Sequence, residues 1–133
     1  MSVNVYKRQS LQSGWTRVDL LLEIYDRAIA AIQNCEAAEK AGDDVLFGKQ
    51  SVLAQKALLA IHSGLKPEED EVAFNIARLL LFAADAVEAK NYGAAVKVLQ
   101  DLRGGFAAVA EEANQLERDG VIPGFPNETG AVF

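Results

Sequence analysis

The chain has 133 residues, half of them hydrophobic and about a quarter charged, which is the size and composition of one soluble globular domain. Its net charge of −6 leaves no basic stripe to neutralise phosphates, so we expect no nucleic-acid binding and no docking on an anionic membrane. Charge interrupts every apolar stretch well before about 18 residues, which argues against membrane insertion. The single cysteine, Cys35, excludes an intrachain disulfide and fits a reducing, cytoplasmic environment.

The first predicted helix covers residues 17–40 and follows an N-terminal arm, residues 1–14, that is too short to fold alone. Thr16 can accept an amide hydrogen of the first turn, and Asp19 stands where a capping-box carboxylate would reach back. Gly42 supplies the left-handed residue that commonly ends a helix.

This first helix is apolar over more of its circumference than one buried stripe requires. One stripe consists of Val18, Leu21, Tyr25, Ala28, Ile32 and Cys35. A second stripe consists of Leu20, Ile24, Ala31 and Ala38. Two interpretations fit this surplus: a helix at the centre of a bundle, which the pattern alone favours, or a groove for a partner.

Three more helices follow, over residues 45–62, 68–90 and 94–118. Gly64 and Pro67 mark the end of one helix and the start of the next, because glycine caps a helix and proline suits a first turn. The connections between the helices are short, which favours antiparallel neighbours.

The third and fourth predicted helices each carry one unusual feature. The third helix has a core face and, beside it, a second apolar face made of Ala73, Ala77, Leu81 and Ala84. Gly104 and Gly105 interrupt the apolar stripe of the fourth helix, where we expect close backbone packing, with a bend as the alternative.

The fold class predicted from these segments is all-α, an antiparallel up-down four-helix bundle with a short N-terminal arm or helix. Residues 1–120 form the single helical-bundle domain, and residues 121–133 form a non-helical tail rich in glycine and proline. The residues expected to be largely buried are Tyr25, Ile32, Leu53, Leu58, Leu80, Leu99 and Phe106.

Catalytic chemistry finds little support in the sequence, so we expect no enzyme, no metal and no cofactor. The only histidine, His62, falls on the polar side of its predicted helix. The acidic run 68–71 cannot converge on one cation from a helix, and it is better explained by the helix dipole. No glycine-rich phosphate loop follows a strand.

Several short segments resemble the FliS family of flagellar export chaperones, whose long helix starts with Leu-Tyr-Asp-Gly-Ala-Ile. Here residues 24–29 read Ile-Tyr-Asp-Arg-Ala-Ile. Asn4-Val5-Tyr6 is similar to the family's Asn-Pro-Tyr, and Thr16 stands at its helix-capping serine. Residues 102–106, Leu-Arg-Gly-Gly-Phe, are similar to its Leu-Arg-Asp-Ala-Trp. The resemblance covers residues 4–113.

The resemblance implies a cytoplasmic chaperone that binds the disordered C-terminal region of flagellin, prevents its premature polymerisation and keeps it competent for export. The second apolar faces of the first and third helices would then hold the client, with the arm shaping the groove. The residues predicted to contact the partner are Tyr6, Leu20, Ile24, Tyr25, Ala77 and Leu81. Two alternatives stay open: another helical chaperone or adaptor of secretion or motility, and a homodimeric structural or regulatory module.

Overall fold

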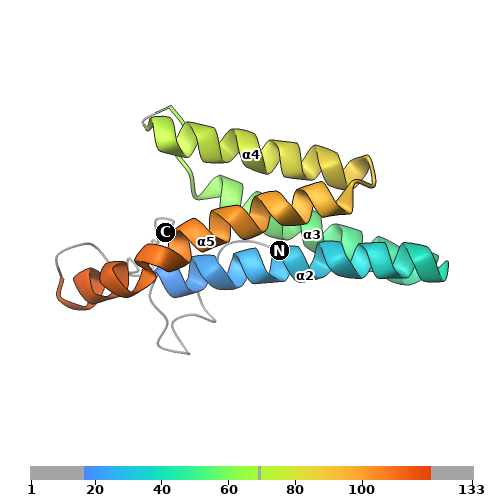
Figure 1. The fold of residues 1–133 in the computed structure, drawn as a ribbon, viewed down its shortest axis with the longest axis horizontal. Helices are drawn as coiled ribbons and strands as arrows, with labels where there is room; N and C mark the ends of the chain where they lie inside the picture. The colour runs from blue at the N-terminus through green and yellow to red at the C-terminus, as the bar shows by residue number, and fades with distance from the viewer. Residues whose placement is uncertain (1–16, 69, 121–133) are drawn as a thin grey trace.

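The computed structural model describes residues 17–68 and 70–120 of the chain. Its elements are four helices, α2 (Arg17–Ala41), α3 (Asp44–Ser63), α4 (Glu71–Glu88) and α5 (Tyr92–Arg118), and these ranges contain no strand. Successive helices run in opposite directions along one long axis (Figure 1). The predicted antiparallel all-α bundle is therefore confirmed. The arm with Tyr6, the capping residue Thr16 and the tail 121–133 lie outside the described residues.

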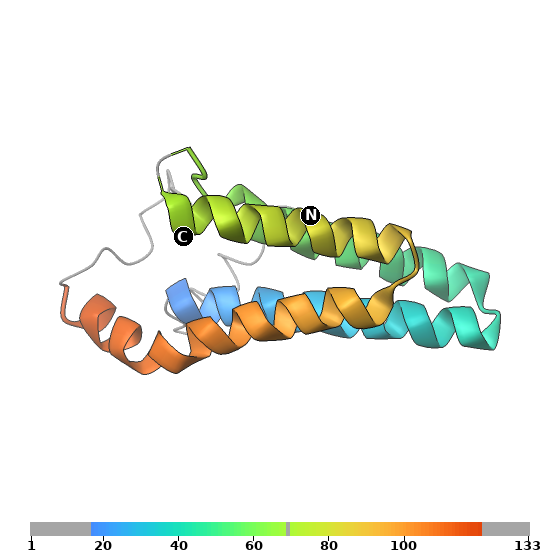
Figure 2. The same cartoon turned by 45° about the horizontal axis from the view of Figure 1, so that its top comes forward.

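The helix α2 is the central element of the bundle. It packs against α3 along one side and against α5 along another, and these are the two most extensive helix contacts. The helix α4 packs mainly on α5 and only lightly on α3, and it lies on the far side of the bundle from α2 (Figures 1 and 2). One flank of α4 therefore meets the bundle, and the rest of its circumference faces outward.

Side-chain caps set the N-terminal starts of α3 and α4. Asp43 accepts the amide hydrogen of Leu46 at 3.0 Å and caps α3. Asp70 accepts the amide hydrogen of Val72 at 2.7 Å and caps α4 in the same way. The prediction that this helix starts at residue 68 is therefore wrong, because an extended aspartate with its side chain on the first turn sets the start at Glu71.

The end of α4 and the start of α5 also differ from the prediction. Helix α4 ends at Glu88, because Lys90 takes a left-handed conformation with φ of 62°. Helix α5 begins at Tyr92, two residues earlier than expected, after Asn91, whose side chain accepts the amide hydrogen of Ala94 at 3.4 Å.

The core lies along α2 and is formed from all four helices. Five of the residues expected inside are buried, namely Tyr25, Ile32, Leu58, Leu80 and Leu99, and so is Cys35. Leu53, however, is 45% exposed, so its predicted burial is wrong. Ala54 points into the core, and the rotation of about 100° per residue carries Leu53 to the edge of α3. Phe106 is only partly buried and packs against the outside of the core.

The two adjacent glycines of α5 are not a point of close packing. A methyl group placed at Gly104 or Gly105 would meet no atom of another described helix within 4 Å, and both positions are exposed. The expectation of close backbone approach is therefore wrong. The helix continues through both glycines, and its C-terminal turns bend away from its first part (Figure 2).

Candidate partner-binding surface

The second apolar stripe of α2 is part of the core. Leu20 and Ile24 are both fully buried. Asn34 projects from the same side of α2, and its side-chain amide donates to Gln50 of α3 at 3.2 Å, which places this stripe against α3. The prediction that Leu20 and Ile24 form a separate, accessible face is therefore wrong, because a helix between two neighbours buries two stripes.

Tyr25 lies on the other stripe of α2 and faces α5. Its ring centroid is 5.8 Å from that of Phe106, with the two rings tilted by 36°. The side chain is fully buried, and its hydroxyl oxygen has no hydrogen-bond partner among the described residues. Burial raises the pKa of this hydroxyl well above its usual value, so the group stays protonated. Direct contact with a partner would require neighbouring side chains to move.

Next to this aromatic pair, Asp26 of α2 and Arg103 of α5 form a bidentate ion pair. The Nε and Nη2 atoms of Arg103 donate to the two carboxylate oxygens of Asp26 at 2.5 and 3.1 Å. Hydrogen bonding to Asp26 raises the pKa of the Arg103 guanidinium. Residues 25–26 and 103–106, which carry much of the family resemblance, therefore contact each other in pairs across the interface of the two helices.

Replacing Tyr25 by phenylalanine is expected to raise the free energy of unfolding by about 0.5 to 1.5 kcal/mol, because it removes a buried hydroxyl that lacks a partner. Tyr92→Phe is the matched control, since the Tyr92 hydroxyl donates to Glu39 at 2.6 Å and its removal should lower stability. Urea titration of both variants measures the difference. A loss for Tyr25→Phe as large as that for Tyr92→Phe would show that the Tyr25 hydroxyl is hydrogen-bonded after all.

The two partner-binding residues predicted on α4 have different environments. Ala77 is buried against the bundle, so its assignment to an accessible face is wrong. It lies one turn from Leu80, which is also buried, so the bundle covers this side of the helix. Leu81 is 57% exposed and stays available to a partner. Of the six predicted residues, Leu81 alone lies on the surface within the described part of the chain.

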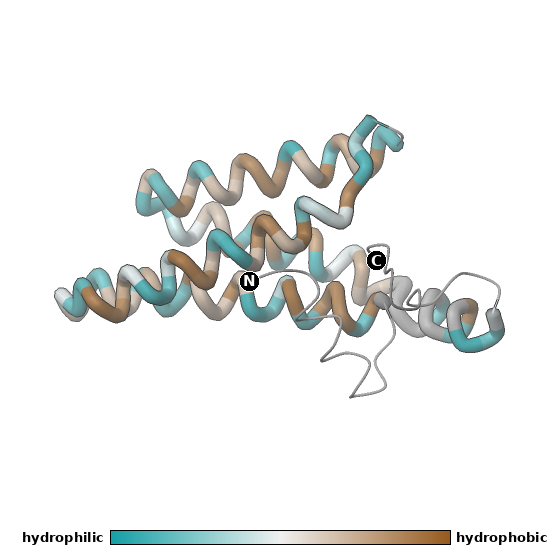
Figure 3. Tube along the Cα trace, turned by 180° about the vertical axis from the view of Figure 1, so that it is seen from behind, coloured by the Kyte–Doolittle hydropathy of each residue, from teal (hydrophilic) through white to brown (hydrophobic). Residues whose placement is uncertain are grey.

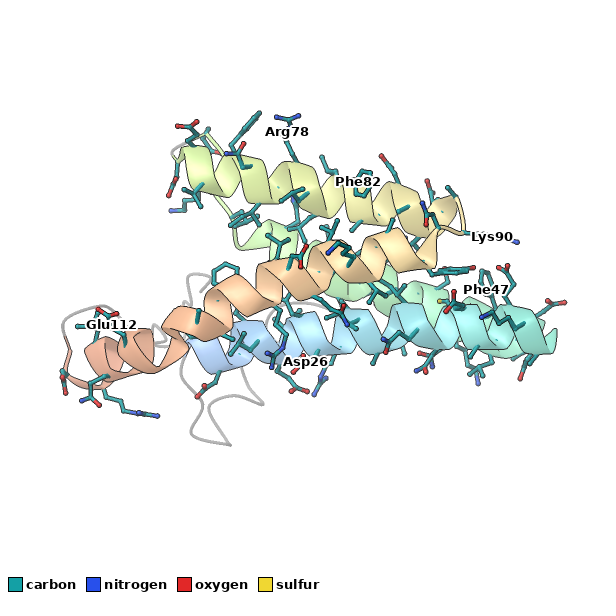
Figure 4. All side chains as sticks on the ribbon, viewed as in Figure 1. Asp26, Phe47, Arg78, Phe82, Lys90 and Glu112 are labelled. Carbon is teal, nitrogen blue, oxygen red and sulfur yellow. The ribbon has the colours of Figure 1, made fainter. Side chains whose placement is uncertain are left out.

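Besides Leu81, several other large apolar side chains of α4 are exposed, some on its outer side and some on the flank beside it. Arg78 projects from this helix away from the rest of the bundle (Figure 4), with its guanidinium carbon 5.9 Å from the centre of the Phe74 ring. Hydrophobic positions recur along α4 where it is seen from behind (Figure 3). The exposed large apolar residues, which we name the α4 surface, are Val72, Phe74, Leu79, Leu81 and Phe82.

The helix α3 adds a second row of exposed apolar side chains. Val45, Val52 and Leu59 are spaced by seven residues, or nearly two turns, so they follow one line along α3. This spacing is visible in the sequence and is the signal that could have identified the row. The two lysines Lys49 and Lys56 lie beside it and are exposed. We name Val45, Val52 and Leu59 the α3 row.

A cleft of about 290 Å³ with charged groups in its lining lies between α2 and the start of α5. Its lining includes Glu36, Lys97 and Asp101. At its edge, Tyr92 donates to Glu39, which lowers the pKa of that carboxyl, and Lys90 lies 3.5 Å from the same carboxylate. This cleft offers charged groups of both signs and a hydrogen-bonded tyrosine, so it lacks the character of an apolar client groove.

Within residues 17–68 and 70–120, no group of three His, Cys, Asp or Glu side chains is placed to hold a metal ion. None of the helices in that part of the chain has the length and apolar character that a membrane crossing requires. Comparison of the chain with protein-family models, with curated proteins and with solved structures finds no match.

Proposed function

We propose that this protein is a flagellar export chaperone that binds the disordered C-terminal region of flagellin in the cytoplasm. It would prevent premature polymerisation of flagellin and keep it competent for export. The observation that carries the proposal is the set of exposed apolar side chains on α3 and α4. A monomeric soluble domain rarely leaves so many large apolar groups in water unless a partner covers them.

Two further observations support this proposal. The residues that resemble the chaperone family meet in the structure as the pairs Tyr25–Phe106 and Asp26–Arg103, so they belong to one interface between α2 and α5. The outer side of α4 is free of other described helices along its length, which leaves room for a segment that folds as it binds.

The α4 surface and the α3 row replace the buried residues of α2 as the proposed contacts of the client. Leu81 stays in the set, and Phe82 joins it as a large aromatic anchor. Leu20, Ile24, Tyr25 and Ala77 would act indirectly, by holding the helices that present the surface. Tyr6 stays a prediction from the resemblance.

Titration calorimetry with the C-terminal flagellin segment of the same organism tests the proposal. Phe82→Asp is expected to weaken binding at least about tenfold, because it removes an aromatic anchor and sets an anion against apolar peptide. Leu81→Asp should act in the same direction, and thermal melting should show both variants folded. Ala30→Asp on the exposed side of α2 is the matched control and should bind like the wild type.

The possible outcomes test the proposed function and the proposed contact surface separately. If the wild type fails to bind the flagellin segment, the chaperone function is wrong, and the alternative of another secretion or motility client gains support. If the wild type binds and neither Leu81→Asp nor Phe82→Asp weakens the complex, the function stands and the proposed surface is wrong.

A further inference from the structure

The outer side of α4 carries Arg78 and Asp85 among its apolar residues, with Glu71 and Glu88 nearer the two ends of the helix, and neither Arg78 nor Asp85 is neutralised within the described chain. Phe74, Arg78, Leu81, Phe82 and Asp85 lie on this one side, because their spacings of three, four and seven residues are helical. No ion pair joins Arg78 or Asp85 to another residue in ranges 17–68 and 70–120. The two are separated by about 10 Å of helix rise, too far for direct contact with each other.

This pattern becomes complementary when the helix faces an antiparallel copy of itself. With a two-fold axis between residues 81 and 82, Arg78 of one copy lies opposite Asp85 of the other, and the same pair forms again on the other side of the axis. Leu81 and Phe82 meet at the centre. Ala89, a small residue, lies opposite Phe74 and leaves space for its ring.

A parallel arrangement would place Arg78 against Arg78 and Asp85 against Asp85, which is repulsive. In the antiparallel register no two like charges of α4 fall directly opposite each other, since Glu88 falls opposite Asn75 and Glu71 falls opposite a position beyond the end of the helix. We propose that a second copy of this chain docks antiparallel on the outer side of α4, through the apolar centre Leu81–Phe82 and two reciprocal Arg78–Asp85 ion pairs.

The dimer should be weak and reversible. One helix pair buries less than the roughly 1,200 Å² of a stable standard interface. The exposed central side chains supply the attraction, and the two ion pairs set the direction of the helices, since charge pairs select register more than they add affinity. The docking does not depend on the client. If the proposed function is also correct, the dimer would cover Leu81 and Phe82 until flagellin displaces the second copy.

Sedimentation equilibrium of the full chain without client, from about 10 µM to about 1 mM, tests the docking. The average mass is expected to rise with concentration from 14.3 kDa toward twice that value. Arg78→Glu and Asp85→Arg should each raise the dissociation constant at least about tenfold, because each creates two like-charge pairs. Both side chains are exposed, so both variants should melt like the wild type.

Mixing the two variants gives the decisive result. An equimolar mixture of Arg78→Glu and Asp85→Arg should associate as tightly as the wild type, because both ion pairs are restored with one reversed. The double variant Arg78→Glu/Asp85→Arg should also dimerise on its own. Lys56→Glu on α3 makes the same change in net charge as Arg78→Glu and should leave association unchanged.

Other outcomes overturn the proposal. A mass that stays at 14.3 kDa over the whole concentration range excludes the dimer. Association that is insensitive to Arg78→Glu and Asp85→Arg excludes this surface. A mixture that associates no better than its two components excludes the antiparallel pairing. None of these results changes the measured affinity for the flagellin segment. The proposed function therefore still stands if the dimer is excluded.

Discussion

Replacing Ile24 by aspartate is expected to unfold the bundle. Ile24 is fully buried on the side of α2 that faces α3. The change removes an aliphatic side chain from the core and places a carboxyl group there without a partner. Loss of the aliphatic group alone costs about 2 to 5 kcal/mol, and the buried carboxyl adds several more. Their sum is comparable to the roughly 5 to 15 kcal/mol that stabilise a typical domain.

Circular dichroism during thermal melting measures this effect, and Leu81→Asp supplies the control. The same type of substitution at Leu81 meets water and should change the free energy of unfolding by less than about 0.5 kcal/mol. A folded Ile24→Asp variant that melts like the wild type but no longer binds flagellin would restore Ile24 to the client surface. Collapse of the fold is what its burial predicts.

Leu99→Ala is expected to cost about 2 to 5 kcal/mol, because it opens a cavity at a fully buried position of α5. This position belongs to the core that α5 shares with α2. The free energy of unfolding from a denaturant titration measures the loss. A change below about 0.5 kcal/mol would place Leu99 outside the core.

Leu53→Ala is the matched control for this measurement, because it removes the same atoms from a residue that is 45% exposed. It should cost clearly less than Leu99→Ala, since part of the side chain is in water in the folded protein. Equal losses in the free energy of unfolding at the two positions would mean that Leu53 is as buried in solution as Leu99.

The helices were predictable because their signals are local. Gly42 ends the first helix in a left-handed conformation, as predicted, and the structure adds the next residue, Asp43, as the cap of α3. The sequence predicts too early a start for α4, because an acidic run suits the first turn of a helix as well as its cap. Only the hydrogen bond that the Val72 amide donates to the Asp70 carboxylate distinguishes these two positions.

The partner-binding residues were harder to predict, because a helical pattern shows how much of a helix is apolar but not how many neighbours it has. The two stripes of α2 are both covered, one by α3 and the other by α5, so Leu20 and Ile24 are core residues. On α4 the bundle covers one side alone. Leu79 and Phe82 therefore stay exposed despite being as hydrophobic as the residues inside.

The contact between Asp26 and Arg103 also depends on tertiary structure. The two residues are 77 positions apart, and each is an ordinary charged residue on an amphipathic helix. Both lie in segments with a family resemblance, but no spacing rule links them. They meet because α2 and α5 pack side by side (Figure 1).

The reactivity of the single thiol, Cys35, reports on local opening of the helical bundle. Its side chain is buried on α2, and burial, with the nearby Glu39 carboxylate as a second cause, raises its pKa. Since the thiolate is the reactive form, an oxidant or alkylating reagent meets an unreactive group as long as the bundle is closed. The rate at which Cys35 is labelled therefore measures how often α2 separates from the helices packed on it, and it does so whichever partner is bound to the surface of the protein.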